Sequence, residues 1–216
     1  IWIKSETERQ QGYITGWFSK AEFDKKYGRG KWRCMIRFAI FQMMHDSWRT
    51  IDNGRSSSTN AAADLLERIH TTSSAINVAI LQRFRALLRQ PLVGQHSPLL
   101  ATRDMKRAYR QIDVRPDQLP FSIICVWHME LGTWVFGELR ALAFGFSAAV
   151  IQFYRFAALL TAIARRWLAI PITNFFDDYK ITELALGDAS GAQFFDLLVS
   201  RLRWLFDIDK AQQGLS

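Results

Sequence analysis

The spacing of hydrophobic and polar positions changes several times along the chain, and these changes predict its elements. Residues 1–30 are mixed and polar, with a loop marked by Gly28 and Gly30. Apolar and basic residues then alternate over 31–51. A helical spacing returns over 61–89, where the expected buried stripe consists of Leu65, Ile69, Ile76, Ile80, Phe84, Leu87 and Leu88.

Beyond Pro91 the predicted elements become more regular. We expect strands at 99–104, 121–127 and 133–136, a helix over 146–168, a hairpin formed by 170–176 and 179–184, and a last helix capped by Asp188. The helix stripes are Val150, Phe153, Ala157, Leu160 and Ala164, then Phe194, Leu198, Leu202 and Leu205. This order is most of a split β-α-β sheet, whose closing strand we expect beyond residue 216. The predicted class is α+β, with helices on one face of an antiparallel sheet.

Composition adds a basic charge to this picture. The chain has 216 residues, of which 49% are hydrophobic and 22% charged, and this excludes disorder and coiled-coil composition. Its formal net charge of +8 suits a polyanionic partner. Cys34 and Cys125 are too few for a disulfide framework and predict reduced core thiols. No apolar run reaches the roughly 18 residues of a membrane helix, and no signal peptide is present, so we expect an intracellular protein (cytoplasm or nucleus) without a membrane partner, cut from a longer polypeptide.

Three carboxylates occupy positions from which they can converge. Asp104 ends a predicted strand, and Asp177 and Asp178 occupy the hairpin tip. These places are neighbours in a split β-α-β sheet, and carboxylates within about 4–6 Å repel one another unless a cation lies between them. Mg²⁺ prefers such hard oxygen ligands, and two ions about 3.5–4 Å apart can activate a hydroxyl and stabilise a leaving phosphate oxygen. Asp-Asp is also ordinary turn composition, so the pair alone decides nothing.

Four short motifs follow one another between residues 31 and 210. They are Trp-Arg-Thr-Ile-Asp at 48–52 with Arg55 and Asn60, Asp-Met-Lys-Arg-Ala-Tyr-Arg-Gln-Ile at 104–112, Phe-Gly at 144–145 with Ala149 and Phe153, and Phe-Phe-Asp-Asp at 175–178. Together they resemble the fingers and palm of retrotransposon-type reverse transcriptases. The chain departs from that family where Ala143 and Val150 replace prolines, where Phe175 replaces tyrosine, and where Asp52 comes one residue early. No departure removes a metal ligand, but together they leave open whether the chain is still active.

The resemblance implies a right-hand polymerase core, with an N-terminal flank at 1–30, fingers at 31–95, a palm at 96–216 and the thumb missing. It implies an RNA-directed DNA polymerase, a nucleotidyltransferase that adds deoxynucleotides to a primer 3′-hydroxyl by two-metal phosphoryl transfer. Asp104, Asp177 and Asp178 would hold two Mg²⁺ ions, with Mn²⁺ as the alternative and the Met105 carbonyl as an extra ligand. The implied partners are dNTPs, an RNA or DNA template with its primer, and further domains of a parent polyprotein (thumb, RNase H or integrase).

For the nucleotide and the template-primer, the resemblance assigns Lys31, Arg49, Tyr109, Phe144, Gly145 and Gln152. Arg49 would grip phosphate oxygens with help from Lys31, and Tyr109 would exclude the 2′-hydroxyl of ribonucleotides. Phe144 and Gly145 would form a floor under the templating base pair, and Gln152 would face the nucleotide. Lys210 lies near the sequence position at which the family often has a lysine that protonates pyrophosphate.

Each of these assignments has an ordinary structural alternative. Tyr109 could be a core aromatic residue, Gly145 a helix-entry glycine, Gln152 a helix-surface glutamine and Lys31 a solvated cation. At the level of function, the alternative is a degenerate, catalytically inactive relative that only binds nucleic acid. A metal-dependent nuclease or integrase is a third hypothesis, which the Phe-Gly motif between the acidic positions argues against.

Overall fold

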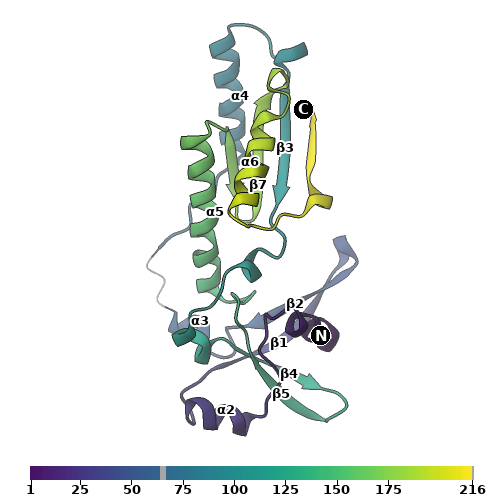
Figure 1. Ribbon diagram of the computed structural model, residues 1–216, viewed down its shortest axis with the longest axis vertical. Helices are drawn as coiled ribbons and strands as arrows, with labels where there is room; N and C mark the ends of the chain where they lie inside the picture. The colour runs from purple at the N-terminus through teal and green to yellow at the C-terminus, as the bar shows by residue number, and fades with distance from the viewer. Residues whose placement is uncertain (64–66, 216) are drawn as a thin grey trace. The chain divides into compact units, whose positions relative to one another are not determined.

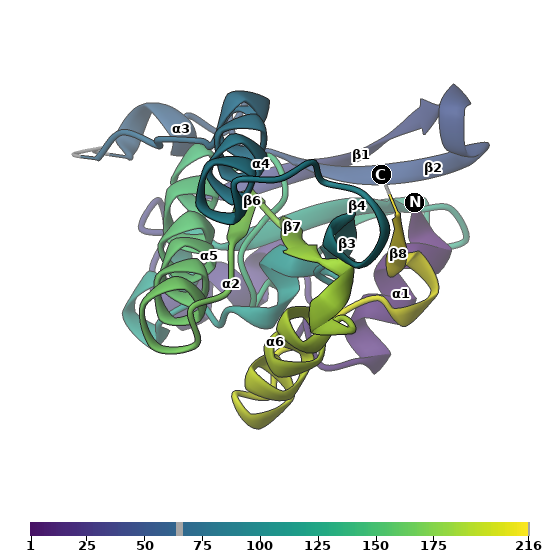
Figure 2. The ribbon, with the colours of Figure 1, turned by 90° about the horizontal axis from the view of Figure 1, so that it is seen from above.

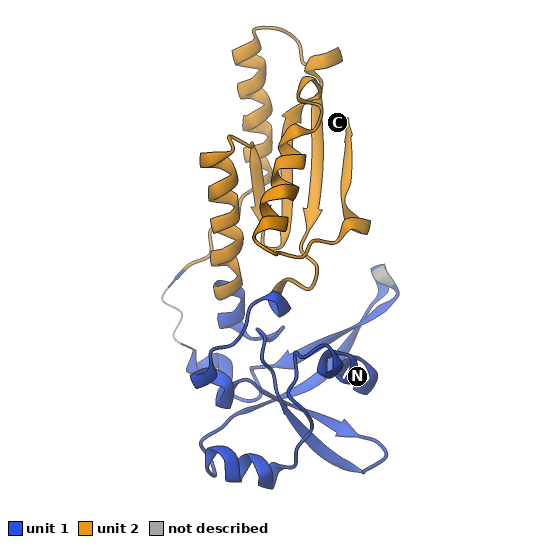
Figure 3. Ribbon diagram, viewed as in Figure 1, with its two compact units in different colours: residues 1–67, 109–151 blue, residues 68–108, 152–216 orange. Residues whose placement is uncertain are grey.

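The computed structural model describes residues 1–63 and 67–215, which form two compact units (Figures 1 and 3). Unit 1 comprises Ile1–Glu67 and Tyr109–Ile151, and unit 2 comprises Arg68–Ala108 and Gln152–Ser216. Each unit has its own four-stranded sheet, so the chain is α+β as expected. Each unit is also built from two separated segments, so neither coincides with a predicted domain, and the fingers at 31–95 and palm at 96–216 stay predictions.

The sheet of unit 1 has the order β2-β1-β4-β5, in which β1 and β4 run parallel and the other pairs antiparallel. Its elements are α1 (Trp2–Gln10), α2 (Lys20–Tyr27), β1 (Cys34–Gln42), β2 (Ser47–Asn53), α3 (Thr59–Ala62), β4 (Ile123–His128) and β5 (Thr133–Glu138). The flank at 1–30 therefore holds two helices where only a loop was predicted. Ser19 and Glu22 form a capping box at the start of α2, a signal that the sequence already contains.

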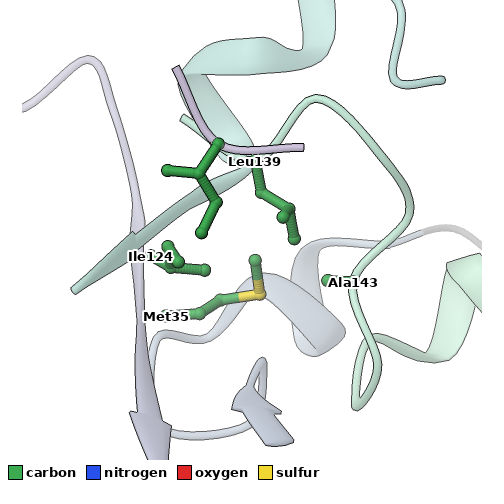
Figure 4. Packing of buried hydrophobic residues seen from close by; sticks show 5 residues of the cluster. Met35, Ile124, Leu139 and Ala143 are labelled. Atoms are coloured by element: carbon green, nitrogen blue, oxygen red, sulfur yellow. The ribbon is translucent and has the colours of Figure 1, made fainter. Parts of the chain in front are cut away.

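The core of unit 1 lies between strands β1 and β4 and the segments that follow α1 and β5. Figure 4 shows Met35 of β1, Ile124 of β4, Leu139 and Ala143, which pack together with Ile14, and all five are buried. Cys34 and Cys125 lie on the neighbouring strands β1 and β4 as free thiols, in agreement with the predicted reduced state.

Unit 2 has the sheet order β6-β7-β3-β8, with every pair antiparallel. Its main elements are α4 (Ser74–Leu88), β3 (Pro98–Asp104), α5 (Ser147–Trp167, which begins in unit 1), β6 (Ile172–Phe175), β7 (Asp178–Leu184), α6 (Ser190–Arg201) and β8 (Gln212–Leu215). From β3 onward the order within this unit is β-α-β-β-α-β, the split β-α-β arrangement. Two expectations are corrected: the strands predicted at 121–127 and 133–136 belong to the sheet of unit 1, and the closing strand β8 lies inside the chain.

Short 3-10 helices connect these elements. They are η1 (Met43–His45), η2 (Gly94–His96), η3 (Ala108–Gln111), η4 (Pro116–Phe121), η5 (Ala185–Gly187) and η6 (Ile208–Lys210).

Helices α5 and α6 cover the same face of the unit 2 sheet. Tyr179 and Asn174 are directly paired on β7 and β6, so their side chains share a face. The Tyr179 ring packs against Phe195 of α6 at 5.2 Å between centroids, and the Thr161 hydroxyl of α5 is bonded to the Asn174 side chain at 3.0 Å. The expected packing of the last two helices on one face is confirmed.

Helix α4 lies on the opposite face, at the β6–β7 edge (Figure 2). Thr173 pairs with Lys180, so both side chains point away from α5 and α6, and the Thr173 hydroxyl lies 3.2 Å from the Asn77 side chain of α4. Of the predicted helical run over 61–89, residues 67–73 are not helical. The Thr72 hydroxyl instead bonds the backbone of β6 at Asn174.

The predicted buried stripes of α5, α4 and α6 agree with the observed burial to different degrees. In α5, Phe153, Ala157, Leu160 and Ala164 are buried and Val150 is half-buried, as predicted. In α4, the half-buried face carries Ile80, Phe84 and Leu88, but Ile76 and Leu87 are exposed; Leu65 lies outside the described residues. In α6 the prediction is wrong, because the buried residues are Ala192, Phe195 and Val199, whereas Phe194 is 56% exposed.

The cap of α6 also differs from the prediction. The Glu183 carboxylate of β7, not Asp188, accepts from the backbone N–H groups of Gly191 at 2.9 Å and Ala192 at 3.4 Å. With this contact in place, Phe195, rather than Phe194, packs against the sheet.

Within the described part of the chain, α5 alone is long and apolar enough to cross a membrane by length and composition. A core helix of a soluble protein passes the same test. Of the most apolar 18-residue window of α5, 33% is buried.

Candidate active site

The three predicted carboxylates lie at one end of the unit 2 sheet. Asp104 ends β3 and is the direct antiparallel partner of Asp178, the first residue of β7. The backbone N–H of Met105 donates to the Asp177 carbonyl at 3.1 Å, so all three aspartates come together there. Residues two apart on a strand share a face, so Asp178 faces the same way as Lys180, away from α5 and α6. Asp104, its direct partner on β3, faces that way too. The predicted neighbourhood of first strand and hairpin is therefore present.

The hairpin turn that carries Asp177 is strained. Phe175 and Asp178 close a two-residue loop in which Phe176 has φ +54°, a conformation that such loops usually give to glycine. The ring of Phe176 packs edge-on against Phe175 at 5.0 Å between centroids. Strained non-glycine residues cluster at functional sites, where the surrounding packing holds them in place.

Lys210 brings a positive charge to this end of the sheet. Backbone bonds from Lys106 to Leu205 at 3.0 Å and from Asp207 to Asp104 at 2.8 Å lay the chain after α6 beside β3. The following helix η6 then places the Lys210 ammonium in an ion pair with the Asp104 carboxylate. Bonding to Asp104, and the further charges of Asp207 and Asp177, raise the pKa of Lys210.

The carboxylates also act on one another. Partial burial, followed by the negative charge of Asp104, raises the pKa of Asp178 above its ordinary value of 3.8, and Lys210 offsets only part of this shift. A raised carboxyl pKa means that the folded chain holds this proton over a pH range in which the unfolded chain has lost it. The ionised Asp178 therefore destabilises the fold as the pH rises through that range.

Asp178→Asn is expected to stabilise the fold when no divalent metal is present. Because like charges opposite each other on paired strands are destabilising, we expect the free energy of unfolding to rise by about 0.5 kcal/mol at neutral pH. The gain in stability should shrink as the pH falls toward about 3.9, the ordinary carboxyl pKa, because wild-type Asp178 is then protonated as well. Urea unfolding at both pH values, with chelator, measures this; a variant less stable than wild type at neutral pH would contradict it.

The residues at this end of the sheet fit Mg²⁺ by their chemistry. Three carboxylates supply hard oxygen ligands, and the repulsion from Asp104, which adds to burial in raising the Asp178 pKa, is the kind that a bound cation relieves. Among the described residues, no group of three or more acidic, histidine or cysteine side chains is already arranged to hold a metal ion. The positive charge beside Asp104 is the Lys210 ammonium, not a metal ion. Metal binding therefore requires the side chains of Lys210 and the three aspartates to rearrange.

A second cluster lies in unit 1 and gathers three of the residues assigned to the nucleotide. The Arg49 guanidinium of β2 lies over the Phe144 ring at 4.8 Å from its centroid, and the Tyr109 ring meets Phe144 edge-on at 5.7 Å. We call these three side chains the arginine–aromatic cluster. Tyr109 is half-buried and Arg49 is exposed, so both the gate role and the ordinary packing role remain compatible with the structure.

Gly145 follows this cluster and needs the absence of a side chain. Its φ is +114°, and a Cβ there would lie 2.4 Å from the backbone oxygen of Asp52. The Asn60 amide donates to the Gly145 carbonyl at 3.3 Å, while its oxygen accepts from the Ser147 N–H at 2.9 Å at the start of α5. The close approach at Gly145 is to the end of β2, two residues before α5 begins, as the helix-entry alternative expects, and the role of Phe144 and Gly145 under a base pair stays a prediction.

The other two assigned residues are described by their own surroundings. Lys31 is exposed in the turn after α2. Gln152 is exposed on α5, where its side-chain oxygen accepts from Arg155 at 2.9 Å, as the helix-surface alternative expects. Their roles toward a nucleotide stay predictions.

Sequence reasoning missed a buried ion cluster in unit 1, formed by Glu8, Arg37, Asp52 and Arg110. The Arg37 side chain is 0% and the Asp52 side chain 1% exposed, and they form a two-point ion pair at 2.7 and 3.3 Å. Burial opposes ionisation of Asp52, but the charges of Arg37 and Arg110 outweigh it and lower the Asp52 pKa. Two of its members, Asp52 and Arg110, lie within the quoted motifs, but nothing in those motifs indicates that they pair with each other.

Comparisons with known proteins do not assign a family. No family model matches the chain, and no curated protein matches it significantly.

Proposed function

We propose that this chain is the catalytic core of an RNA-directed DNA polymerase of the reverse-transcriptase type. The observation that carries the proposal is the meeting of Asp104, Asp177 and Asp178 at one end of a split β-α-β sheet. In this proposal the sheet of unit 2 is the palm, and the β1–β2 hairpin of unit 1 belongs to the fingers. The activity would consume dNTPs, extend a primer and release pyrophosphate while it copies a template inside the cell, in the cytoplasm or nucleus.

The aspartates would hold the metal and the cationic groups would hold phosphate. Asp104, Asp177 and Asp178 would bind Mg²⁺, or Mn²⁺ in its place, and the bound ions would supply activation of the primer 3′-hydroxyl and neutralisation of the leaving pyrophosphate. Lys210, once separated from Asp104, would hold a proton and a positive charge close to the same groups. Positioning and charge neutralisation carry most of the rate of such a transfer.

The arginine–aromatic cluster would bind the incoming nucleotide. Arg49 presents a planar fork of donors that matches phosphate oxygens, and it is already oriented by the Phe144 ring. Tyr109, whose ring meets Phe144 edge-on, would lie against the sugar and exclude a 2′-hydroxyl. The net charge of +8 favours a template-primer duplex as the partner.

Primer extension tests the proposal. A labelled DNA primer annealed to an RNA or a DNA template is incubated with the chain and dNTPs, with Mg²⁺, with Mn²⁺, and with EDTA. We expect stepwise extension with either metal and a complete loss with EDTA. Salt-sensitive binding of the duplex without extension under either metal would favour the inactive nucleic-acid-binding alternative, and cleavage of the duplex without dNTPs would favour a nuclease.

A further inference from the structure

We infer that the buried ion cluster of unit 1 positions the arginine–aromatic cluster, and thereby sets the affinity and sugar selectivity for the incoming nucleotide. This inference rests on the proposed function, because it concerns the residues that would contact the nucleotide. The members of the ion cluster would touch no substrate themselves, so they are positioning residues.

The ion cluster is closed and electrically balanced. Arg37 binds Asp52 and, at 2.7 Å, Glu8. Arg110 binds the same two carboxylates, Glu8 at 3.1 Å and Asp52 at 3.3 Å. Two positive and two negative charges alternate in a ring, so each charge has a partner on either side. Such a ring is rigid in a low-dielectric interior because any movement leaves a buried charge uncompensated.

Each member of the arginine–aromatic cluster is tied to this ring through a short piece of backbone. Tyr109 immediately precedes Arg110, whose guanidinium also donates to the Leu142 carbonyl at 2.5 Å, two residues before Phe144. The Asp52 N–H donates to the Phe144 carbonyl itself at 2.8 Å. Arg49 lies three residues before Asp52 on β2. The ring therefore fixes three separate segments against one another.

Helix α1 closes the ring through Glu8, which connects the N-terminal flank to the proposed nucleotide-binding residues. Without the negative charge of Glu8, Arg37 and Arg110 share the single carboxylate of Asp52. The Arg110 guanidinium then keeps its ion pair with Asp52 and loses the one with Glu8. We expect the Tyr109 ring beside it to become less fixed against Phe144. Because a gate against a hydroxyl group acts only when its position is fixed, nucleotide affinity and sugar selectivity should fall together.

Glu8→Gln tests this with Glu6→Gln as the matched control. Both residues lie on α1, but Glu6 pairs with Arg9 and Trp17 and has no bond to the ring. Single-nucleotide incorporation is measured with dNTP and with rNTP, after circular dichroism and melting show equal folding. We expect E8Q to raise the KM for dNTP about tenfold, to change kcat less than about threefold, and to lower the preference for dNTP over rNTP about tenfold. E6Q should stay within about twofold of wild type on each value.

Unchanged KM and selectivity in E8Q would overturn the inference and leave the proposed function standing. If E8Q does not fold, Arg110→Lys replaces it, since lysine keeps the charge but lacks the two-point fork, and the same losses are expected. If the wild type incorporates nothing, the proposed function fails, and equilibrium binding of a fluorescent dNTP decides the inference separately. Weaker binding by E8Q than by wild type then supports it, and equal binding overturns it.

Discussion

Asp104→Asn is expected to lower nucleotide incorporation by at least about 10³-fold, the scale of losing a preorganised electrostatic contact in a catalytic site. The amide has the shape of the carboxylate but carries no charge, so it is a poor ligand for Mg²⁺. The fold should persist, because Asp104 is held through its backbone by the β3–β7 pairing and by the bond from Asp207. Primer extension measures the rate, and the rise in melting temperature on adding Mg²⁺ measures metal binding, which this variant should also lose.

Asp196→Asn is the matched control for this experiment. Asp196 on α6 accepts two hydrogen bonds, at 2.7 and 2.8 Å, from Arg103, the neighbour of Asp104 on the opposite face of β3. Its loss removes an acidic charge from the same unit without touching the carboxylate end. Asp196→Asn should therefore extend primers like wild type. Incorporation by Asp104→Asn within tenfold of wild type would contradict a metal-binding role for this carboxylate.

Lys210→Gln separates the loss of a metal ligand from the loss of the Lys210 ion pair. Asp104→Asn removes both at once, because Lys210 pairs with Asp104. Lys210→Gln removes the pair and leaves all three carboxylates, so it should keep the Mg²⁺-induced rise in melting temperature. If it lost that rise as Asp104→Asn does, the effect of Asp104 would be attributed to the ion pair.

The acidic end of unit 2 was predictable because its signals are local. The apolar strand ending at Asp104, the hairpin around Asp177 and the helical spacing of Phe153, Ala157 and Leu160 each lie within a short stretch of sequence. Their order then predicts which strands lie side by side. The partners of β4 and β5 were not predictable in this way, because the choice of sheet depends on pairing with β1, which is distant along the chain.

The missed features depend on burial, which local patterns do not report. Arg37 belongs to a stretch that alternates basic and apolar residues, and nothing near it distinguishes a buried arginine from a solvated one. Its partners come from α1 and β2, and Arg110 from a third segment. The stripe of α6 was misassigned for a similar reason, since both Phe194 and Phe195 fit a helical spacing and only the contact with Glu183 decides between them.

Arg37→Met is expected to lower the free energy of unfolding by about 3–5 kcal/mol, the range for breaking a buried ion pair on one side. Methionine fills much of the same volume, so the loss comes mainly from the charges it leaves behind. Asp52 and Glu8 then share Arg110 alone, and Asp52, at 1% exposure, cannot be solvated instead. The result is an excess of negative charge in the core of unit 1.

The pH dependence identifies this mechanism. In wild type the pKa of Asp52 is lowered below its ordinary value of 3.8, so this carboxylate adds stability that is fully present above that value and is lost as the pH falls through the lowered pKa. In Arg37→Met the main charge that lowers the Asp52 pKa is gone while burial remains, so its pKa should rise. The deficit relative to wild type should then be largest at neutral pH and shrink in mild acid, where protonation removes the excess charge.

Urea unfolding of both chains at neutral pH and at about pH 5 measures these differences, with Arg9→Met as the control. Arg9 is the partner of Glu6 in a partly exposed ion pair on α1, and its loss should cost much less than the loss of Arg37 at either pH. A deficit in Arg37→Met that is the same at both pH values would point to lost packing instead of unpaired charge. A deficit below about 1 kcal/mol would show that the ring is not needed to hold unit 1 together, and would remove the rigidity on which its positioning role depends.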